Sequence, residues 1–191
     1  MLEMTAQVLF LGSPLLPVAI AQGLCIKYDW LSRLRQPLDF GKSFQGKRIF
    51  GDHKTWRGLI VNVVFCVLGV TVQAWLQVKG YLPSWLFLLD YENHTLLAGV
   101  LLGLGMTAGE LPNSFLKRRF EIPPGESREG LPGVIFFIYD QVDLTIGIWV
   151  FLYVLIKPSL WLILWSLLLT LALHLLVSIV GYVLGMRKTL V

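Results

Sequence analysis

The chain has 191 residues, of which 55% are hydrophobic and only 15% are charged, and its mean hydropathy is +0.69. A soluble domain of this length carries far less apolar sequence, so the composition indicates an integral membrane protein. The net charge of +4 does not indicate a nucleic-acid partner, because the basic residues adjoin apolar segments, where they are first a topology signal. Cys25 and Cys66 fall in apolar runs, which predicts small core residues and no disulfide.

Five apolar segments are long enough to cross a bilayer, which takes about 20 residues each. The predicted fold is therefore one all-α integral membrane domain, residues 1–191, with two basic cytoplasmic loops. The expected spans are residues 5–26, 58–78, 96–115, 133–156 and 160–184. Pro14 and Pro17 are expected to kink the first span. The third span contains two GxxxG pairs, which predict close helix packing: Gly99, Gly103, Gly105 and Gly109.

Lys and Arg are distributed very unequally between the two sides of the predicted fold. Loop one (residues 27–57) holds eight of them, loop three (residues 117–132) four, and the C-terminal tail two, whereas the other side has only Lys79 and Lys157. This bias predicts that loops one and three and the C-terminus are cytoplasmic and that the N-terminus is outside. A multi-pass protein of the cell membrane is therefore expected, with both polar loops on the nucleotide-containing side.

Asp140 and Asp143 are three residues apart inside the fourth span, so they share one helix face. Carboxylates in a membrane helix are costly and usually functional, and two adjacent ones need a cation or a proton. Mg²⁺ suits such a pair, because it binds one or two carboxylates together with substrate phosphates. The alternative is a structural ion pair with a nearby Lys or Arg.

A polar stripe crosses the end of the third span. Glu110, Asn113, Ser114 and Lys117 follow helical spacing, and Arg118 and Arg119 come directly after. Glu110 lies between Gly109 and Pro112, which should interrupt the backbone ladder, and it is a candidate third metal ligand. Lys117, Arg118 and Ser114 are candidate phosphate ligands. For Arg119 an ordinary topology charge is the simpler interpretation.

Loop one ends in a second candidate anion site. Residues 41–47 resemble a phosphate-binding P-loop, but Arg48 stands where Ser or Thr is needed and no strand precedes it. The stronger feature is residues 51–58, where Asp52 or Thr55 could cap the second span. Free backbone N–H groups there would bind phosphate with basic side chains. The expected substrate-binding residues of this loop are Gly51, Asp52, Lys54, Thr55 and Arg57. A capped helix with topology charges is the alternative.

Three segments together resemble the CDP-archaeol synthase family, which is related to the phosphatidate cytidylyltransferases. They are residues 37–58 (PLDFGKSFQGKRIFGDHKTWRG), 109–119 (GELPNSFLKRR) and 140–143 (DQVD). The resemblance implies a Mg²⁺-dependent enzyme that transfers the cytidylyl group of CTP to a membrane lipid phosphate, giving a CDP-lipid and pyrophosphate. It departs from the family pattern at Glu110, where Asp is expected, and in the longer segment PPGESREGLPG of loop three.

In that mechanism the lipid phosphate needs no general base, since its second pKa is about 6. The requirement is charge neutralisation and alignment. The expected catalytic residues are Lys54, Lys117, Asp140 and Asp143, with Asp140, Asp143 and Glu110 holding Mg²⁺. The apolar spans leave both ether-linked isoprenoid and ester-linked acyl chains open.

Other classes remain as alternatives at this point. A CDP-alcohol phosphotransferase needs a longer pattern of acids that the chain lacks. A small transporter with intramembrane carboxylates would spread its acids over several spans, and a structural membrane subunit would not need Asp140 with Asp143.

Overall fold

The computed structural model describes residues 1–122 and 130–183. For residues 131, 132 and 180–183 it describes the helical backbone alone. The helices are α1 (Leu2–Gly12), α2 (Leu15–Lys27), α3 (Trp56–Val78), α4 (Tyr91–Arg119), α5 (Leu131–Leu152) and α6 (Leu160–Val183). Short elements lie in the connections: η1 (Ser32–Leu34), β1 (Ser43–Phe44), β2 (Lys47–Arg48) and η2 (Ser84–Leu86).

The described part of the chain contains five helical stretches long and apolar enough to cross a membrane, which confirms the predicted all-α membrane fold. The expected bounds hold closely for α3 and α6. By contrast, α4 extends beyond the expected 96–115 at both ends, so Lys117 is helical and not in a loop. Pro112 removes one backbone bond but does not end the helix, and α5 ends four residues before the expected 156. Residues 123–129 and the basic residues of the C-terminal tail lie outside the described residues.

The first span is broken into two helices, as its prolines predicted. α1 ends at Gly12, and Pro14 is the N-cap of α2. A backbone carbonyl freed inside the bilayer needs a new donor. Gln73 of α3 adds a donor at the break, because its buried amide donates to the carbonyl of Phe10, which also accepts from the N–H of Ser13 at 3.1 Å, and, at 3.0 Å, to the hydroxyl of Ser13. A Cβ at position 69 would lie 2.6 Å from Cβ of Pro14. The break in the first span can therefore pack against α3 only because α3 has a glycine at this position.

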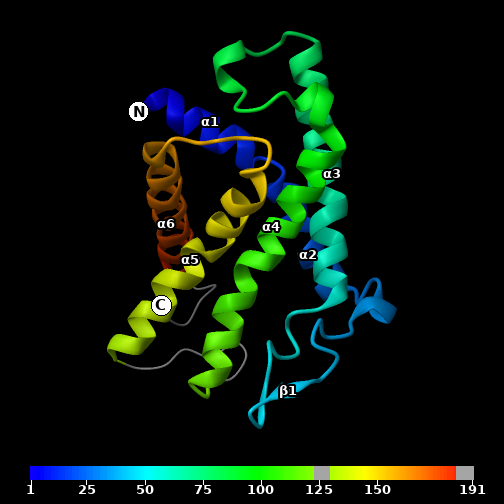
Figure 1. Cartoon of the computed structure of the whole chain (residues 1–191), viewed down its shortest axis with the longest axis vertical. Helices are drawn as coiled ribbons and strands as arrows, with labels where there is room; N and C mark the ends of the chain where they lie inside the picture. Colours follow the sequence, from blue (N-terminus) through cyan, green and yellow to red (C-terminus); the bar gives the residue numbers. More distant parts are fainter. Residues whose placement is uncertain (123–129, 184–191) are drawn as a thin grey trace.

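α4 is the central helix, packed between α3 and α5 (Figure 1). Its two predicted glycine pairs face different neighbours. A Cβ at Gly99 or Gly103 would lie 2.5 and 2.4 Å from the Cα atoms of Val67 and Val63 in α3. A Cβ at Gly109 would lie 2.3 Å from the carbonyl oxygen of Asp143 in α5. The pairs therefore bring α4 into backbone contact with both neighbours, which confirms the prediction of close packing.

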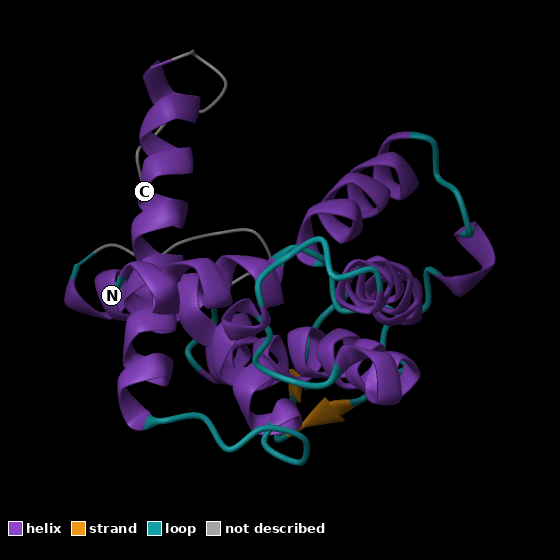
Figure 2. Cartoon of the chain, turned by 90° about the horizontal axis from the view of Figure 1, so that it is seen from above, coloured by secondary structure: helices purple, strands orange, loops and turns teal. Residues whose placement is uncertain are grey.

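Loop one, the last turns of α4 and the first turns of α5 lie at the same end of the molecule (Figure 1). Within loop one, β1 and β2 form an antiparallel hairpin whose turn residues Gln45 and Gly46 both have positive φ. Such a two-residue turn favours glycine at its second position. The P-loop-like residues 41–47 therefore belong to a hairpin. This agrees with the sequence analysis, which did not accept them as a phosphate-binding loop. In the view from above, α6 leads away from the other helices (Figure 2), and its residues 172–177 are exposed.

Candidate active site

The polar residues of α4 divide between two faces of the helix. Asn113 and Lys117, four residues apart, point toward α5, where Asp140 and Asp143 point back. Asn113 Nδ2 donates to Asp140 Oδ1 at 2.5 Å and to Asp143 Oδ2 at 2.8 Å. Lys117 Nζ lies 2.6 Å from Asp140 Oδ1. Spacings of three and four residues place side chains on one face, so the sequence pattern accounts for this cluster once α4 and α5 are in contact.

Asp143 differs from Asp140 in its surroundings. Asp143 is 5% exposed and accepts a 2.6 Å hydrogen bond from the backbone N–H of Leu144, whereas the Asp140 side chain is 39% exposed and paired with Lys117. Within residues 1–122 and 130–183 no Lys or Arg forms an ion pair with Asp143. Glu110 and Asp140 both lie near enough to repel its charge. A buried carboxylate in this position is stabilised by a bound cation or by a proton.

Asn113 provides a further oxygen at this point. Its side chain is 2% exposed, and while both carboxylates accept from its Nδ2, its buried Oδ1 has no hydrogen-bond partner among the described residues. A buried amide oxygen without a donor costs about 1–3 kcal/mol. Carboxylate and amide oxygens are ligands that Mg²⁺ accepts. The donor set and the orphaned oxygen therefore fit a hard cation at Asp140 and Asp143.

The second face of α4 carries Thr107, Glu110, Ser114 and Arg118, again at helical spacing. Glu110 forms an ion pair with Lys54 of loop one. Ser114 is half-buried. Arg118 has no carboxylate partner among the described residues, and its buried Nε has no acceptor. A guanidinium without a carboxylate partner is suited to a phosphate oxygen.

Loop one is organised by a residue that the sequence analysis did not single out, Asp39. Its buried carboxylate accepts hydrogen bonds from the backbone N–H groups of Gly41, Phe50 and Gly51, at 2.9 to 3.1 Å, and a 2.8 Å bond from Arg48. Burial alone would raise the pKa of Asp39, but these donors outweigh it and lower the pKa to about 2. The available signal was the spacing Asp-Phe-Gly, typical of an aspartate that caps a turn.

Most of the predicted substrate-binding residues of loop one have structural partners. The N–H of Gly51 donates to Asp39, and exposed Asp52 pairs with Arg48. Thr55 is the N-cap of α3, where its hydroxyl accepts from the N–H of Gly58 at 3.2 Å, which confirms one of the two predicted caps. Arg57 is held by Asp29 and by the carbonyls of Cys25 and Trp30. Lys54 is the member of this set that reaches α4.

Arg119 holds the hairpin of loop one against α4. Its guanidinium donates to the carbonyls of Phe44, Lys47 and Arg48 and stacks on the rings of Phe44 and Phe115. This residue was interpreted from the sequence as a simple topology charge. The structure gives it a second role as a clamp, because three backbone carbonyls of the hairpin accept from one side chain.

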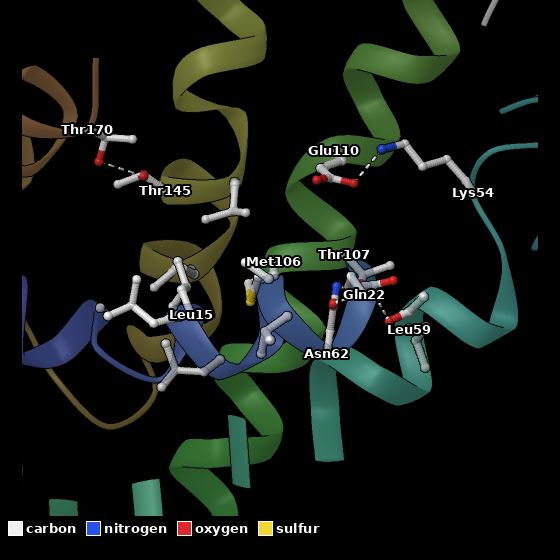
Figure 3. Close-up of a pocket in the computed structure, with 18 of the residues that line it drawn as sticks. Leu15, Gln22, Lys54, Leu59, Asn62, Met106, Thr107, Glu110, Thr145 and Thr170 are labelled. Atoms are coloured by element: carbon white, nitrogen blue, oxygen red, sulfur yellow. Dashed lines mark hydrogen bonds and ion pairs between the residues drawn. The ribbon is translucent and has the colours of Figure 1, made fainter. Parts of the chain in front are cut away.

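A cavity of about 1,650 Å³ extends from loop one into the helices, with a mostly apolar wall and polar groups at distinct positions (Figure 3). Lys54 and Glu110 lie together at the loop-one end. One helical turn further along α4, Gln22 donates to Asn62 at 2.8 Å and Asn62 donates to Thr107 at 3.0 Å. The apolar wall comes from all six helices and includes Leu9, Val18, Leu59, Leu102, Ile148 and Leu169. Asn62 therefore both lines the cavity and bonds across helices.

The comparisons with known proteins agree with this geometry. A protein-family model described as CarS-like, CDP-archaeol synthase, matches residues 8–190. The chain belongs to the CDP-archaeol synthase family. The CDP-archaeol synthase of Methanoculleus marisnigri is 35% identical over 161 residues, covering 80% of this chain and 87% of that protein. The CDP-archaeol synthase of Methanosarcina barkeri is 32% identical over 166 residues, covering 80% and 89%.

A solved structure described as an intramembrane enzyme for archaeal membrane lipids biosynthesis shares the fold. Its TM-score is 0.62 at 22% identity, with 90% of this chain and 92% of that chain covered. Membership of the CDP-archaeol synthase family makes the chain an enzyme, a CTP-dependent lipid cytidylyltransferase. The family resemblance read from the three segments is thereby confirmed, and the transporter alternative is not favoured.

Proposed function

We propose that the protein transfers the cytidylyl group of CTP to a membrane lipid phosphate with Mg²⁺, giving a CDP-lipid and pyrophosphate for phospholipid synthesis. The observation that carries this proposal is the arrangement of α4. One face, with Asn113 and Lys117, meets the carboxylate pair Asp140 and Asp143 of α5, and the adjoining face carries Glu110, which pairs with Lys54 of loop one at the end of a large apolar cavity. A metal-nucleotide site and a lipid site thus share one helix.

The cavity is the proposed lipid site. Pockets for drug-sized ligands have volumes of about 300–1,000 Å³, and this one is larger, about 1,650 Å³, with an apolar wall. It therefore has room for hydrocarbon chains, with Lys54 as the cation for the phosphate at its polar end. The relatives' name indicates that the lipid is of the archaeol type.

The carboxylate cluster is the proposed nucleotide site. No group of three or more His, Cys, Asp and Glu side chains in metal-binding arrangement occurs among the described residues, so two carboxylates would hold Mg²⁺ together with the phosphates of CTP. Mg²⁺ bound there would supply positive charge to the triphosphate. Lys117, Ser114 and unpaired Arg118 extend from the same helix end as phosphate ligands. Glu110, the third predicted metal ligand, is engaged by Lys54.

The proposed reaction uses the lipid site and the nucleotide site together. An ionised oxygen of the lipid phosphate, held by Lys54, attacks the α-phosphorus of CTP, and the bond from that phosphorus to the bridging oxygen of the β-phosphate breaks. Pyrophosphate leaves with the electron pair, and the cytidylyl group remains on the lipid. Lys117 and Arg118 neutralise the charge that develops on the departing phosphates. Since the attacking oxygen is already ionised near neutral pH, no side chain has to remove a proton.

Pyrophosphate release tests the proposal directly. Purified protein in detergent should release pyrophosphate only when CTP, Mg²⁺ and a lipid phosphate are all present, and the cytidylyl group should appear on the lipid. Chelation of Mg²⁺ should abolish release, and Lys54→Ala and Lys117→Ala should each weaken it, because each removes a cation from the phosphate cluster. A panel of ether-linked and ester-linked lipid phosphates identifies the tails. Absence of release with every lipid phosphate would refute the proposed function.

A further inference from the structure

We propose that Glu110 is a specificity-determining residue: its ion pair with Lys54 admits lipids whose phosphate is a monoester and excludes the phosphodiester lipids of the surrounding membrane. This inference rests on the proposed function, because it takes the cavity as the lipid site and Lys54 as its phosphate-binding cation. It concerns which lipid head groups reach Lys54, a step that precedes any transfer to CTP.

The pair stands where a lipid phosphate must arrive. Lys54 and Glu110 both line the loop-one end of the cavity and point toward each other there as an ion pair (Figure 3). Their side chains are 25% and 34% exposed, so neither is sealed inside the protein. Any anion that binds Lys54 has to displace Glu110 or share the lysine with it.

The loop backbone beside Lys54 is held without Glu110. The carbonyl of Lys54 accepts a 2.7 Å bond from the N–H of Leu38, and the N–H of Trp56 donates to the carbonyl of Gln36 at 3.0 Å. The neighbouring Thr55 is fixed as the N-cap of α3. Glu110 therefore acts on the lysine side chain alone, at the ammonium group that a lipid phosphate would bind.

An acid at this point also has a cost. Glu110 lies near enough to Asp143 for the two charges to repel each other, and at Lys54 it competes with any anionic head group. A carboxylate that weakens the binding of every anionic lipid is explained if it leaves appreciable binding only to the lipids that Lys54 attracts most strongly. Specificity of this kind often depends on a repulsive group.

The charge of the head group decides the competition. A phosphodiester carries one negative charge, the same as Glu110, and gains little by replacing it at Lys54. A phosphate monoester approaches two negative charges above its second pKa of about 6. Coulomb attraction scales with that charge, so the monoester displaces the carboxylate where the diester does not. The pair therefore sets a charge threshold at the cavity.

Binding to the intact protein tests the threshold without use of CTP. Thermal melts in neutral detergent would compare a dialkyl or diacyl phosphate monoester with the matching phosphatidylglycerol-type diester. Wild-type protein should be stabilised by the monoester and not by the diester, and the stabilisation should rise from pH 5 to pH 7 as the monoester gains its second charge. Glu110→Gln should be stabilised by both lipids, and Glu110→Asp should retain the discrimination.

A competition assay gives the same contrast in turnover. Added diester should raise the apparent KM of wild-type protein for lipid phosphate by less than about twofold, and that of Glu110→Gln by about tenfold or more. Glu92→Gln is the matched control, because it makes the same change at an exposed position on the same helix. Equal diester competition in wild type and Glu110→Gln would overturn the proposal.

A shift in the Mg²⁺ requirement of Glu110→Gln, without any change in lipid discrimination, would instead assign Glu110 to the metal. Monoester discrimination in the melts, in the absence of any CDP-lipid product, would leave this inference standing and refute the proposed function.

Discussion

At the scale of single residues, the site is a set of charges of which most already have partners. Lys117 neutralises Asp140, Lys54 neutralises Glu110, and Arg48 neutralises Asp39. Within the described residues, Asp143 has no cationic partner, and Arg118 has no anionic one. An unpaired acid and an unpaired base on adjoining helices are complementary to a metal-bound phosphate.

Asp143→Asn should therefore lose activity far more than it loses stability. Turnover should fall at least about 100-fold, equivalent to about 2.7 kcal/mol of transition-state stabilisation. Excess Mg²⁺ should not restore it, because the charge that binds the metal is gone. Initial rates and melting temperature would be measured together, with Glu92→Gln as the control for a lost surface charge. Turnover near the wild-type level would show that the aspartate pair is structural.

Asp39 supports a prediction about pH. Its pKa is lowered to about 2 in the folded protein, below the value of about 3.9 for an unperturbed aspartate. Its contribution to stability is therefore complete above about pH 4 and is lost as pH falls toward 2. Loop one should resist trypsin equally from pH 5 to pH 8, and Asp39→Asn should be cleaved faster at Lys42 and Lys47 throughout that range.

The control for the loop is Asp52→Asn, which removes the other, exposed carboxylate partner of Arg48. Its loop should remain resistant, since the three backbone N–H groups still converge on Asp39. Equal cleavage of the two variants would contradict the assignment of Asp39 as the organiser of this loop.

At the scale of elements, the crossing of α4 and α5 sets the distance between the site residues. Gly105 and Gly109 of α4 meet Gly147 of α5 so closely that a Cβ at Gly147 would lie 2.1 Å from the carbonyl oxygen of Gly105 and 2.5 Å from Cα of Gly109. Asp143 lies one turn before Gly147, and Asn113 one turn after Gly109. The glycines therefore allow the amide of Asn113 to reach both aspartates.

Gly147→Ala should separate the two helices and lower both stability and activity. Overpacking of this kind costs about 1–3 kcal/mol, and here the contact is with backbone, which cannot rotate away. Gly23→Ala in α2 is the matched control, because no atom lies within 4 Å of its added Cβ. Melting temperatures in detergent should fall for Gly147→Ala and stay level or rise for Gly23→Ala. A stable, active Gly147→Ala protein would show that the crossing tolerates a wider spacing.

At the scale of the whole molecule, loop one lies at the same end as the last turns of α4 (Figure 1), and its Lys54 reaches Glu110 there. Fourteen of the sixteen Lys and Arg residues belong to loop one, loop three and the C-terminal tail. The positive-inside bias therefore predicts that this end faces the cytoplasm, where CTP is available.

A topology experiment checks this orientation. A reporter fused after Val191 should be cytoplasmic, and a reporter inserted between Lys79 and Asp90 should be external. The reverse result would place the carboxylate pair on the side without nucleotides and would contradict the proposed function.

The sequence alone determined the features that depend on composition and local spacing. Apolar length predicted five spans, the glycine pairs predicted close packing, and Asp140 with Asp143 were placed on one helix face, because helical periodicity is a local property. The predicted single stripe of Glu110, Asn113, Ser114 and Lys117 divides in the structure, where Asn113 and Lys117 contact α5 and Glu110 contacts loop one. Only the tertiary structure decided which charges meet. It paired Lys54 with Glu110 across 56 residues, gave Arg57 a structural role, and made Asp39 the centre of loop one. Those contacts join distant segments, and their geometry follows from how the helices cross and the loop folds back.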